Sequence, residues 1–188
     1  MLSHRFEEAI IYAIQLHAQQ KRKGSETPYI AHLLAVTSIV LEQGGNEDEA
    51  IAALLHDAIE DQGGETIRLE IQQRFGETVA DIVSGCTNPL IRPWRACKEV
   101  YIDHLRTASP SVRLVASADK LHNARSILQD YHQIGEELWA RFTGGKEGVL
   151  WYYRSVTDTL LSQNITPLGI ELNRVVTEIE HVARTYEQ

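Results

Sequence analysis

Apolar residues recur along this chain at the three- and four-residue spacing that places them on one face of an α-helix. The first such stretch, residues 4–21, carries Phe6, Ile10, Ala13, Ile14 and His17 at this spacing. No run alternates between apolar and polar residues with the period of two that a half-buried strand shows. The pattern therefore predicts an all-α fold, a bundle of about eight to ten helices.

Capping residues and glycine pairs mark where the predicted helices begin and end. Thr27-Pro28 has the form of an N-cap followed by proline, and the helix that it opens runs to Gln43, before Gly44-Gly45. Asn46 begins a capping box for a helix that ends at Gly63-Gly64. Around a loop at 88–93, further helices are expected at 66–75, 78–87, 94–107, from Pro110 to about Tyr131, at 147–163 and from Pro167 onward.

The composition is that of an ordinary globular protein and excludes several classes. The 188 residues are 43% hydrophobic and 23% charged, enough chain for one domain with a buried core. No stretch approaches the ~18 apolar residues of a membrane span, and the charged first residues lack the apolar core of an export signal. Two cysteines without a CxxC spacing are typical of a reduced setting. We therefore expect a cytoplasmic protein with no membrane partner.

The net charge of −8 bears on the partners of the protein. An excess of negative charge disfavours binding to a nucleic acid backbone, so no nucleic acid partner is expected. A small phosphorylated ligand needs only a local basic patch, and Lys21-Arg22-Lys23 is such a run. Most runs of this kind are solvated loops, but this one lies just before the predicted helix that carries His32.

Four polar residues interrupt apolar helical segments in a way that suggests a metal site. His56 and Asp57 follow Leu54-Leu55, His32 lies in an apolar helix, and Asp119 lies in another. A single histidine in such a place is more commonly a core residue with a hydrogen-bond partner. Together, however, the four form a mixed nitrogen and oxygen set that suits Mn, Fe or Zn. Four protein ligands leave room on a six-coordinate ion for a water and a substrate oxygen.

Glu60 and Asp61 add two carboxylates next to this set. They lie three and four residues after Asp57, so the three side chains share one helical face. A charged C-terminal turn that points into solvent is the simpler explanation for Glu60 and Asp61. Acidic residues at a helix C-terminus oppose the helix dipole, however, which favours a functional role.

The pattern of His32, His56-Asp57 and Asp119 resembles the metal-binding pattern of the HD-domain phosphohydrolases. The resemblance is closest to the alarmone hydrolase domain of RelA/SpoT proteins, with specific blocks at 17–61 and 112–128. It implies a single HD hydrolase domain over residues 1–188, with a core at about 4–130 and C-terminal helices at about 131–188. The chain is too short for the synthetase and regulatory domains of the long enzymes. It resembles the small stand-alone alarmone hydrolases of the metazoan SpoT-homologue type.

The resemblance implies a role for each residue that matches the family's motifs. His32, His56, Asp57 and Asp119 would hold one Mn²⁺ per chain, with another divalent transition metal as an alternative. Glu60 and Asp61 would activate water. The residues implied to contact the nucleotide substrate are Arg22, Lys23, Lys98 and Asn123. The implied reaction removes the 3′-diphosphate from guanosine tetra- or pentaphosphate and gives pyrophosphate plus GDP or GTP.

Two positions depart from the family's pattern and leave alternatives open. Cys97 stands before Lys98 where relatives often have arginine, and Asn88 stands where aspartate is common. An adenosine alarmone is therefore an alternative substrate. A nucleotidase that releases inorganic phosphate and a nucleotide sensor without turnover are alternative functions, although the intact Glu60-Asp61 pair argues against a sensor.

Aromatic residues are frequent in the last third of the chain. We expect them to pack the C-terminal helices or to form a contact between copies, so a homo-oligomer is open: Trp139, Trp151, Tyr152 and Tyr153.

Overall fold

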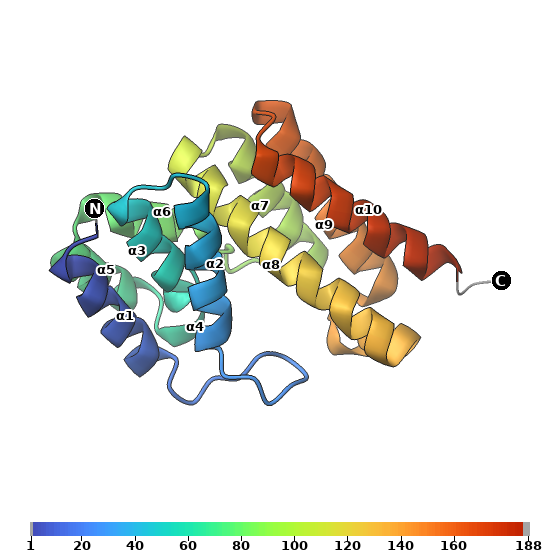
Figure 1. Ribbon diagram of the computed structural model, residues 1–188, viewed down its shortest axis with the longest axis horizontal. Coiled ribbons are helices and arrows are strands. Elements are labelled where there is room, and N and C mark those ends of the chain that lie inside the picture. The colour runs from blue at the N-terminus through green and yellow to red at the C-terminus, as the bar shows by residue number, and fades with distance from the viewer. Residues whose placement is uncertain (1, 186–188) are drawn as a thin grey trace. The chain divides into compact units, whose positions relative to one another are not determined.

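The computed structural model describes residues 2–185, and over that range the fold is all-α, as predicted (Figure 1). An isolated antiparallel bridge between Lys21 and Pro28 is the one β-type pairing of the described residues. The chain divides into two compact units. Unit 1 contains the residues up to Thr87 together with Ala108–Ala118, and unit 2 contains Asn88–Thr107 together with the residues from Asp119 onward.

Unit 1 is a group of helices around α3 (Glu47–Leu55). The others are α1 (His4–Leu16), α2 (Ile30–Glu42), α4 (Ala58–Gln62), α5 (Glu65–Phe75), α6 (Glu77–Cys86) and the first turns of α8 (Pro110–Ile134). Helix α3 packs against α1, α2 and α6, and its residues from Ala50 to Leu55 are all buried. Because this helix has no solvent-facing side after its first turn, the chain carries the polar side chain of His56 directly into the interior.

The start of α8 approaches α6 closely in unit 1. A Cβ atom at Gly85 would lie 2.5 Å from a methyl carbon of Val112, so glycine is needed for this contact. Ser109 caps the helix, since its hydroxyl oxygen accepts a hydrogen bond from the N–H of Val112. The first turns of α8 therefore pack closely on α6 within unit 1.

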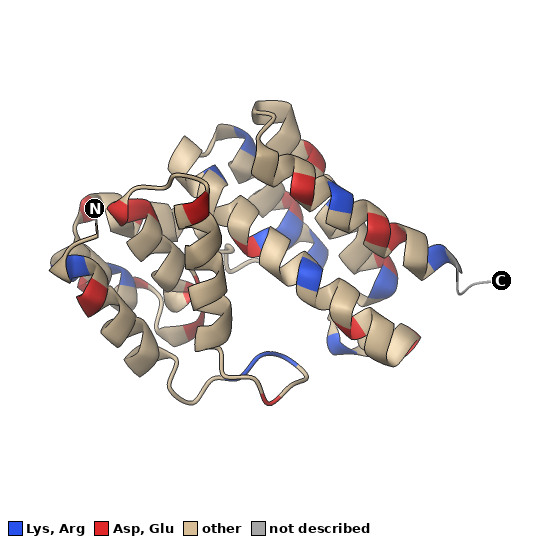
Figure 2. Cartoon of the chain, viewed as in Figure 1, with Lys and Arg blue, Asp and Glu red and all other residues tan. Residues whose placement is uncertain are grey.

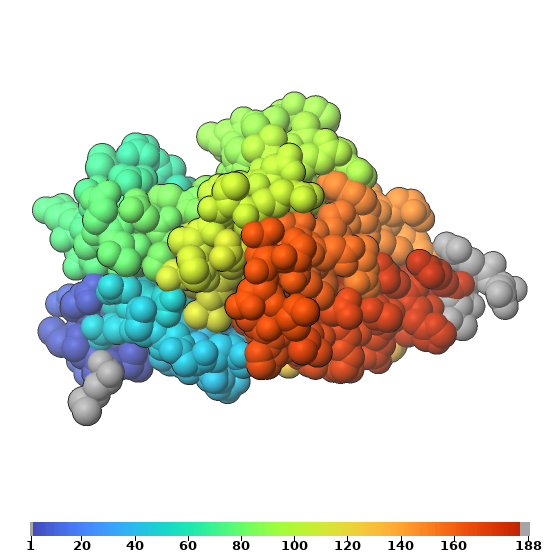
Figure 3. Space-filling view, turned by 90° about the horizontal axis from the view of Figure 1, so that it is seen from above, coloured from blue at the N-terminus to red at the C-terminus, as the bar shows by residue number. Residues whose placement is uncertain are grey.

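Unit 2 is built on α9 (Gly145–Gln163), which packs against α7 (Trp94–Thr107) and α10 (Pro167–Thr185). The surfaces of α9 and α10 are continuous in Figure 3, in orange and red. A short 3₁₀ helix, η1 (Gly135–Arg141), follows α8 and also contacts α9. The ring of Trp94 lies against the start of α9, where a Cβ atom at Gly144 would come within 2.7 Å of it.

Charge is distributed over the helices as their burial requires. Figure 2 shows both signs of charge along α10, whereas the middle parts of α2 and α3 carry none. No helix in the part of the chain that the structure describes is both long and apolar enough to cross a membrane.

Most predicted helix boundaries are confirmed. Helix α7 spans the predicted residues 94–107, and Asn46 forms the predicted capping box with Glu49. The prediction that the first helix reaches residue 21 is wrong, because α1 ends at Leu16 and the chain then folds back on itself. The N–H of Arg22 donates to the carbonyl of Thr27 (2.8 Å), and the N–H of Tyr29 donates to the carbonyl of Gln20 (2.9 Å). This pairing uses Thr27 outside the helix, so α2 begins at Ile30 and Thr27 is not its N-cap.

The predicted single helix from Asn46 to Gly63 is also wrong, because the chain breaks at His56-Asp57. Helix α3 ends at Leu55 and α4 begins at Ala58. The carbonyl oxygen of Ala53 accepts a hydrogen bond from Nδ1 of His56 (2.8 Å), and such a side-chain contact competes with continuation of the helix. As a consequence, Glu60 and Asp61 belong to the first turn of α4 and not to the C-terminal turn of a long helix.

Candidate metal centre

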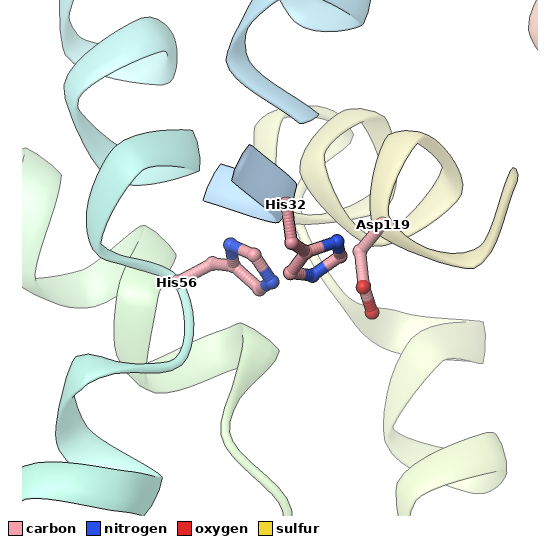
Figure 4. A group of neighbouring side chains, drawn as sticks. All are labelled: His32, His56 and Asp119. Atoms are coloured by element: carbon pink, nitrogen blue, oxygen red, sulfur yellow. The ribbon is translucent and has the colours of Figure 1, made fainter. Parts of the chain in front are cut away.

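Two imidazoles and a carboxylate converge in the interior (Figure 4). One ligand atom each of His32, His56 and Asp119 lies within 4.8 Å of the other two, and all three residues are buried. His32 lies in the first turn of α2, and His56 caps α3. Asp119 follows Ala118 directly in the unbroken helix α8, so its place is set by the same helix that contributes Pro110–Ala118 to unit 1.

The contact between His56 and Asp57 tests whether a cation fits this site. Nδ1–H of His56 donates to the carbonyl of Ala53, so Nε2 of a neutral ring carries a lone pair. Yet Nε2 lies 2.9 Å from Oδ2 of Asp57, which also carries lone pairs. The same oxygen lies 3.6 Å from Nε2 of His32. Acceptor atoms this close repel one another unless a proton or a metal ion lies between them, so the donor set is compatible with a bound metal ion.

The distances between the ligand atoms also fit a divalent transition metal. Metal–nitrogen and metal–oxygen bonds of about 2.0–2.2 Å place ligand atoms at most about 4.4 Å apart across an ion. A separation within 4.8 Å therefore needs only a small adjustment of side chains. Imidazole nitrogen and carboxylate oxygen are donors that such metals accept. His32, His56 and Asp119 could hold the ion, and Asp57 lies against both imidazoles as a fourth donor.

Tyr29, which is not among the predicted site residues, orients the Asp57 carboxylate. Its hydroxyl donates to Oδ2 of Asp57 at 2.6 Å, and its ring meets the ring of His32 edge-on, with centroids 5.5 Å apart. Hydrogen bonds of this kind around a metal ligand fix its orientation. The available signal was the spacing, since Tyr29 precedes His32 by three residues and so lies on the same side of the first helical turn.

Asp119 is held from its own helix. Nζ of Lys120 donates to Oδ2 of Asp119 at 2.6 Å, and the side-chain amide of Asn123 donates to Oδ1 at 2.5 Å. Burial alone would lower the pKa of Lys120, but the Asp119 carboxylate and nearby tyrosines outweigh it, so this pKa lies above its ordinary value. The structure thus places Asn123, predicted to contact nucleotide, beside a predicted metal ligand.

Glu60 and Asp61 are both exposed on α4. The amide of Gln20 donates to Oδ2 of Asp61 at 2.7 Å. Partial desolvation raises the pKa of the Asp61 carboxyl above its ordinary value, the Gln20 hydrogen bond opposes this shift, and the nearby Asp57 and Glu60 carboxylates add to it. A carboxylate with a raised pKa is a stronger proton acceptor.

The predicted nucleotide contacts fall in both units. In unit 1, the half-buried Arg22 places its guanidinium 5.9 Å from the ring centroid of Tyr29, and Lys23 is exposed on the same loop. In unit 2, Nζ of Lys98 donates to Oδ1 of Asn88 (2.9 Å) and lies 5.0 Å from the ring centroid of Tyr152. Arg22 is therefore brought next to Tyr29, one hydrogen bond away from Asp57.

Asn88 and Cys97, the two positions at which the resemblance implies a departure, also make contacts within unit 2. Asn88 accepts the hydrogen bond from Lys98, and Sγ of Cys97 lies 3.2 Å from the carbonyl oxygen of Pro89. Both contacts connect the N-terminal part of α7 to the loop that precedes it.

The sequence of this chain is similar to those of known proteins. The family model described as "HD domain" matches residues 9–150. The guanosine-3′,5′-bis(diphosphate) 3′-pyrophosphohydrolase MESH1 of Xenopus tropicalis is 41% identical over 123 residues, which cover 64% of this chain and 68% of that protein.

Solved structures are similar over most of the chain. A metazoan ortholog of SpoT, described as hydrolysing ppGpp and as playing a role in starvation responses, superimposes with a TM-score of 0.78 at 26% identity, over 95% of this chain and 97% of that one. The protein lmo0812 of Listeria monocytogenes superimposes with a TM-score of 0.71 at 31% identity, over 79% of this chain and 97% of that one.

Proposed function

Because the chain belongs to the HD-domain family, and within it is similar to the MESH1 hydrolases, we propose that it is a guanosine-3′,5′-bis(diphosphate) 3′-pyrophosphohydrolase. The reaction adds water across the bond between the 3′ oxygen and the diphosphate. The 3′ oxygen leaves with a proton as the nucleotide, GDP or GTP, and the diphosphate leaves as pyrophosphate.

The observation that carries the proposal is the convergence of His32, His56 and Asp119, with the carboxylate of Asp57 against both imidazoles. The exposed pair Glu60 and Asp61 follows Asp57 within one helical turn. A buried set of metal donors next to carboxylates that reach solvent is what a metal-assisted hydrolysis needs. A protein that only binds a nucleotide has no use for the second part.

We propose that His32, His56, Asp57 and Asp119 hold one Mn²⁺ per chain. A divalent ion, when bound, neutralises phosphoryl oxygens and makes a water molecule more acidic. The mixed nitrogen and oxygen donors support Mn²⁺, and they would also accept another divalent transition metal. Lys120 and Asn123 keep the Asp119 carboxylate in one orientation, and Tyr29 does the same for Asp57.

The carboxylates on α4 take the proton that the attacking water loses. Asp61 is favoured for this step because desolvation raises its pKa, which makes its carboxylate a stronger base. We assign the orientation of this water to Glu60, in the same turn. Neither residue needs to leave the surface for this role, since both are exposed.

Cationic side chains bind the rest of the substrate. Arg22 combines a planar guanidinium, suited to stacking on a base, with donors for phosphate, and Lys23 adds a second positive charge on the same loop. Lys98 adds a positive charge in unit 2. An adenine base would also stack on a guanidinium, so these residues select the phosphates more strictly than the base.

The remaining properties follow from composition and topology. We propose a cytoplasmic enzyme that acts on small nucleotides and has no nucleic acid partner, which the net charge of −8 supports. We also propose that residues 1–188 form a single HD domain, because α8 contributes residues to both compact units.

A nucleotide panel with Mn²⁺ tests the proposed function. The purified chain is incubated with guanosine and adenosine 3′-diphosphate compounds and with nucleoside monophosphates, and the products are separated by anion exchange. Release of intact pyrophosphate from the guanosine compounds is the expected result. A higher kcat/KM on the adenosine compounds would change the assigned base. Release of inorganic phosphate from monophosphates alone would replace the proposal with a nucleotidase, and binding without any product would replace it with a sensor.

A further inference from the structure

His17 is a buried histidine that neither the metal site nor the proposed reaction uses. It follows α1 directly and is 3% exposed. Its Nδ1 lies 2.7 Å from Oε1 of Gln20, whereas its Nε2 is buried without a hydrogen-bond partner among the described residues. A buried N–H without a partner costs more than a buried lone pair, so the proton belongs on Nδ1. The amide nitrogen of Gln62 also lies 3.3 Å from Nδ1, but the amide oxygen of Gln20 at 2.7 Å needs a proton on Nδ1, so His17 donates to Gln20.

The hydrogen bond from His17 helps to orient the Gln20 amide, which in turn contacts Asp61. Its Oε1 accepts from Nδ1 of His17 and from the amide of Gln62 (2.6 Å), and these two donors decide which way the Gln20 amide faces. The NH₂ group is then turned towards Asp61, to which it donates at 2.7 Å. An amide without these two partners could rotate and offer its oxygen to the carboxylate.

The ring of His17 also contacts Tyr29, the residue that binds Asp57. It stacks on Tyr29, with centroids 5.3 Å apart and an angle of 20° between the planes. The hydroxyl of Tyr29 donates to Asp57. The backbones of Gln20 and Tyr29 are also paired, so His17, Gln20 and Tyr29 form one connected group in the segment that links α1 to α2.

We propose that His17 is a positioning residue that orients two carboxylates at once, Asp57 through Tyr29 and Asp61 through Gln20. We call these contacts the Tyr29 arm, from His17 through Tyr29 to Asp57, and the Gln20 arm, from His17 through Gln20 to Asp61. The Tyr29 arm needs the flat ring of His17, whereas the Gln20 arm needs the donor at Nδ1. The effect on kcat expected from the Gln20 arm rests on the proposed function, whereas the geometry of both arms does not depend on it.

Two substitutions of His17 separate the arms. His17→Phe keeps a flat ring on Tyr29 and removes the donor to Gln20. We expect its Mn²⁺ affinity, measured by isothermal titration calorimetry, to stay near that of the wild type, and its kcat at saturating Mn²⁺ to fall by ~10-fold or more with little change in KM. His17→Asn keeps an amide donor near the position of Nδ1 and removes the ring. We expect ~10-fold weaker Mn²⁺ binding and, at saturating Mn²⁺, a kcat within a few-fold of the wild type.

A third variant tests the same contact if the His17 variants do not fold. Gln20 is only half-buried, so Gln20→Leu should fold, and it should reproduce the loss of kcat of His17→Phe. The double variant should lose no more activity than either single one, because both remove the same contact. The control is Tyr12→Phe, which removes a part-buried hydrogen bond from α1 to Glu70.

The outcomes distinguish this inference from the proposed function. Equal losses of metal affinity and kcat in both His17 variants, in proportion to their loss of stability, would overturn it, as would wild-type values in both. A wild-type protein that releases no pyrophosphate would overturn the proposed function alone. In that case the Mn²⁺ affinities still test the Tyr29 arm, and the non-additivity of His17→Phe and Gln20→Leu in urea unfolding still tests the Gln20 arm.

Discussion

Nζ of Lys98 donates a 2.9 Å hydrogen bond to the side-chain oxygen of Asn88, at a position where the resemblance to the alarmone hydrolases leads us to expect aspartate. The amide is neutral, so this contact orients the lysine without neutralising it. A carboxylate in the same place would form an ion pair with Lys98 and would reduce its attraction for phosphate. Asparagine at position 88 therefore leaves a larger local positive charge than aspartate would.

Asn88→Asp should weaken substrate binding. We expect KM for the 3′-diphosphate substrate to rise several-fold, with kcat little changed, because the ion pair must be weakened each time a phosphate binds. Steady-state kinetics at two ionic strengths measures this effect, and it should shrink at the higher one. The control is Asp103→Asn, which changes an exposed carboxylate on α7, the helix that carries Lys98. A KM equal to that of the wild type would show that Lys98 does not meet the substrate.

Removal of a metal donor should abolish metal binding and activity together. His56→Ala takes away one buried imidazole of the group, and Asp119→Asn weakens another donor without changing its size. We expect about one transition metal ion per wild-type chain by elemental analysis, and far less in either variant. Addition of Mn²⁺ should raise the melting temperature of the wild type only, since a ligand that binds the folded state stabilises it. An unchanged melting temperature of the wild type would count against the site.

Substitution of the α4 carboxylates should separate catalysis from metal binding. Asp61→Asn and Glu60→Gln keep the shape of each side chain and remove its ability to accept a proton. We expect metal content and melting temperature close to those of the wild type, and kcat lower by ~10²–10⁴-fold for the residue that is the main base. Asp61 should show the larger effect. Full activity in both variants, with metal retained, would contradict the assignment.

The hydrogen bonds of Glu171, on α10, to two arginines should make stability depend on pH. Glu171 accepts two hydrogen bonds from Arg174 (2.8 and 2.9 Å) and one from Arg125 of α8 (3.3 Å). The hydrogen bond from Arg174, aided by that from Arg125, lowers the pKa of Glu171 from 4.5 to about 2. A carboxyl whose pKa is lower in the folded state stabilises the fold above its ordinary pKa, and this contribution is lost as the pH falls from 4.5 towards 2.

Glu171→Gln should accordingly be less stable than the wild type at pH 7, by about 1 kcal/mol or less, because the group is partly exposed. The difference should shrink as the pH falls below 4.5. Urea unfolding at pH 7 and pH 4 measures it, with the exposed Glu147→Gln as the charge-removal control. A difference that does not vary between these pH values would show that the charge of Glu171 does not contribute.

The helices of this protein could largely be predicted from its sequence, because periodicity and caps are local properties. The capping box of Asn46 and Glu49 and the limits of α7 follow from residues within one or two turns of each other. The failures occurred where a hydrogen bond that the helical pattern does not reveal competes with the helix. The segment after Leu16 leaves α1 because Gln20 and Arg22 pair with residues on the other side of the loop. The helix from Asn46 breaks because Nδ1 of His56 forms a hydrogen bond with the carbonyl oxygen of Ala53.

The chemistry of the site follows the same division. The sequence by itself determined which donors are present, since His32, His56 and Asp119 are polar residues in segments too apolar to leave them in water. Only the tertiary structure decided that these donors meet, that Tyr29 holds Asp57, and that Gln20 faces Asp61. The physical reason is that hydrogen bonds and metal ligation require atoms within a few ångströms of each other. Spacing along the chain specifies that distance only within a helix, and packing between helices specifies the rest.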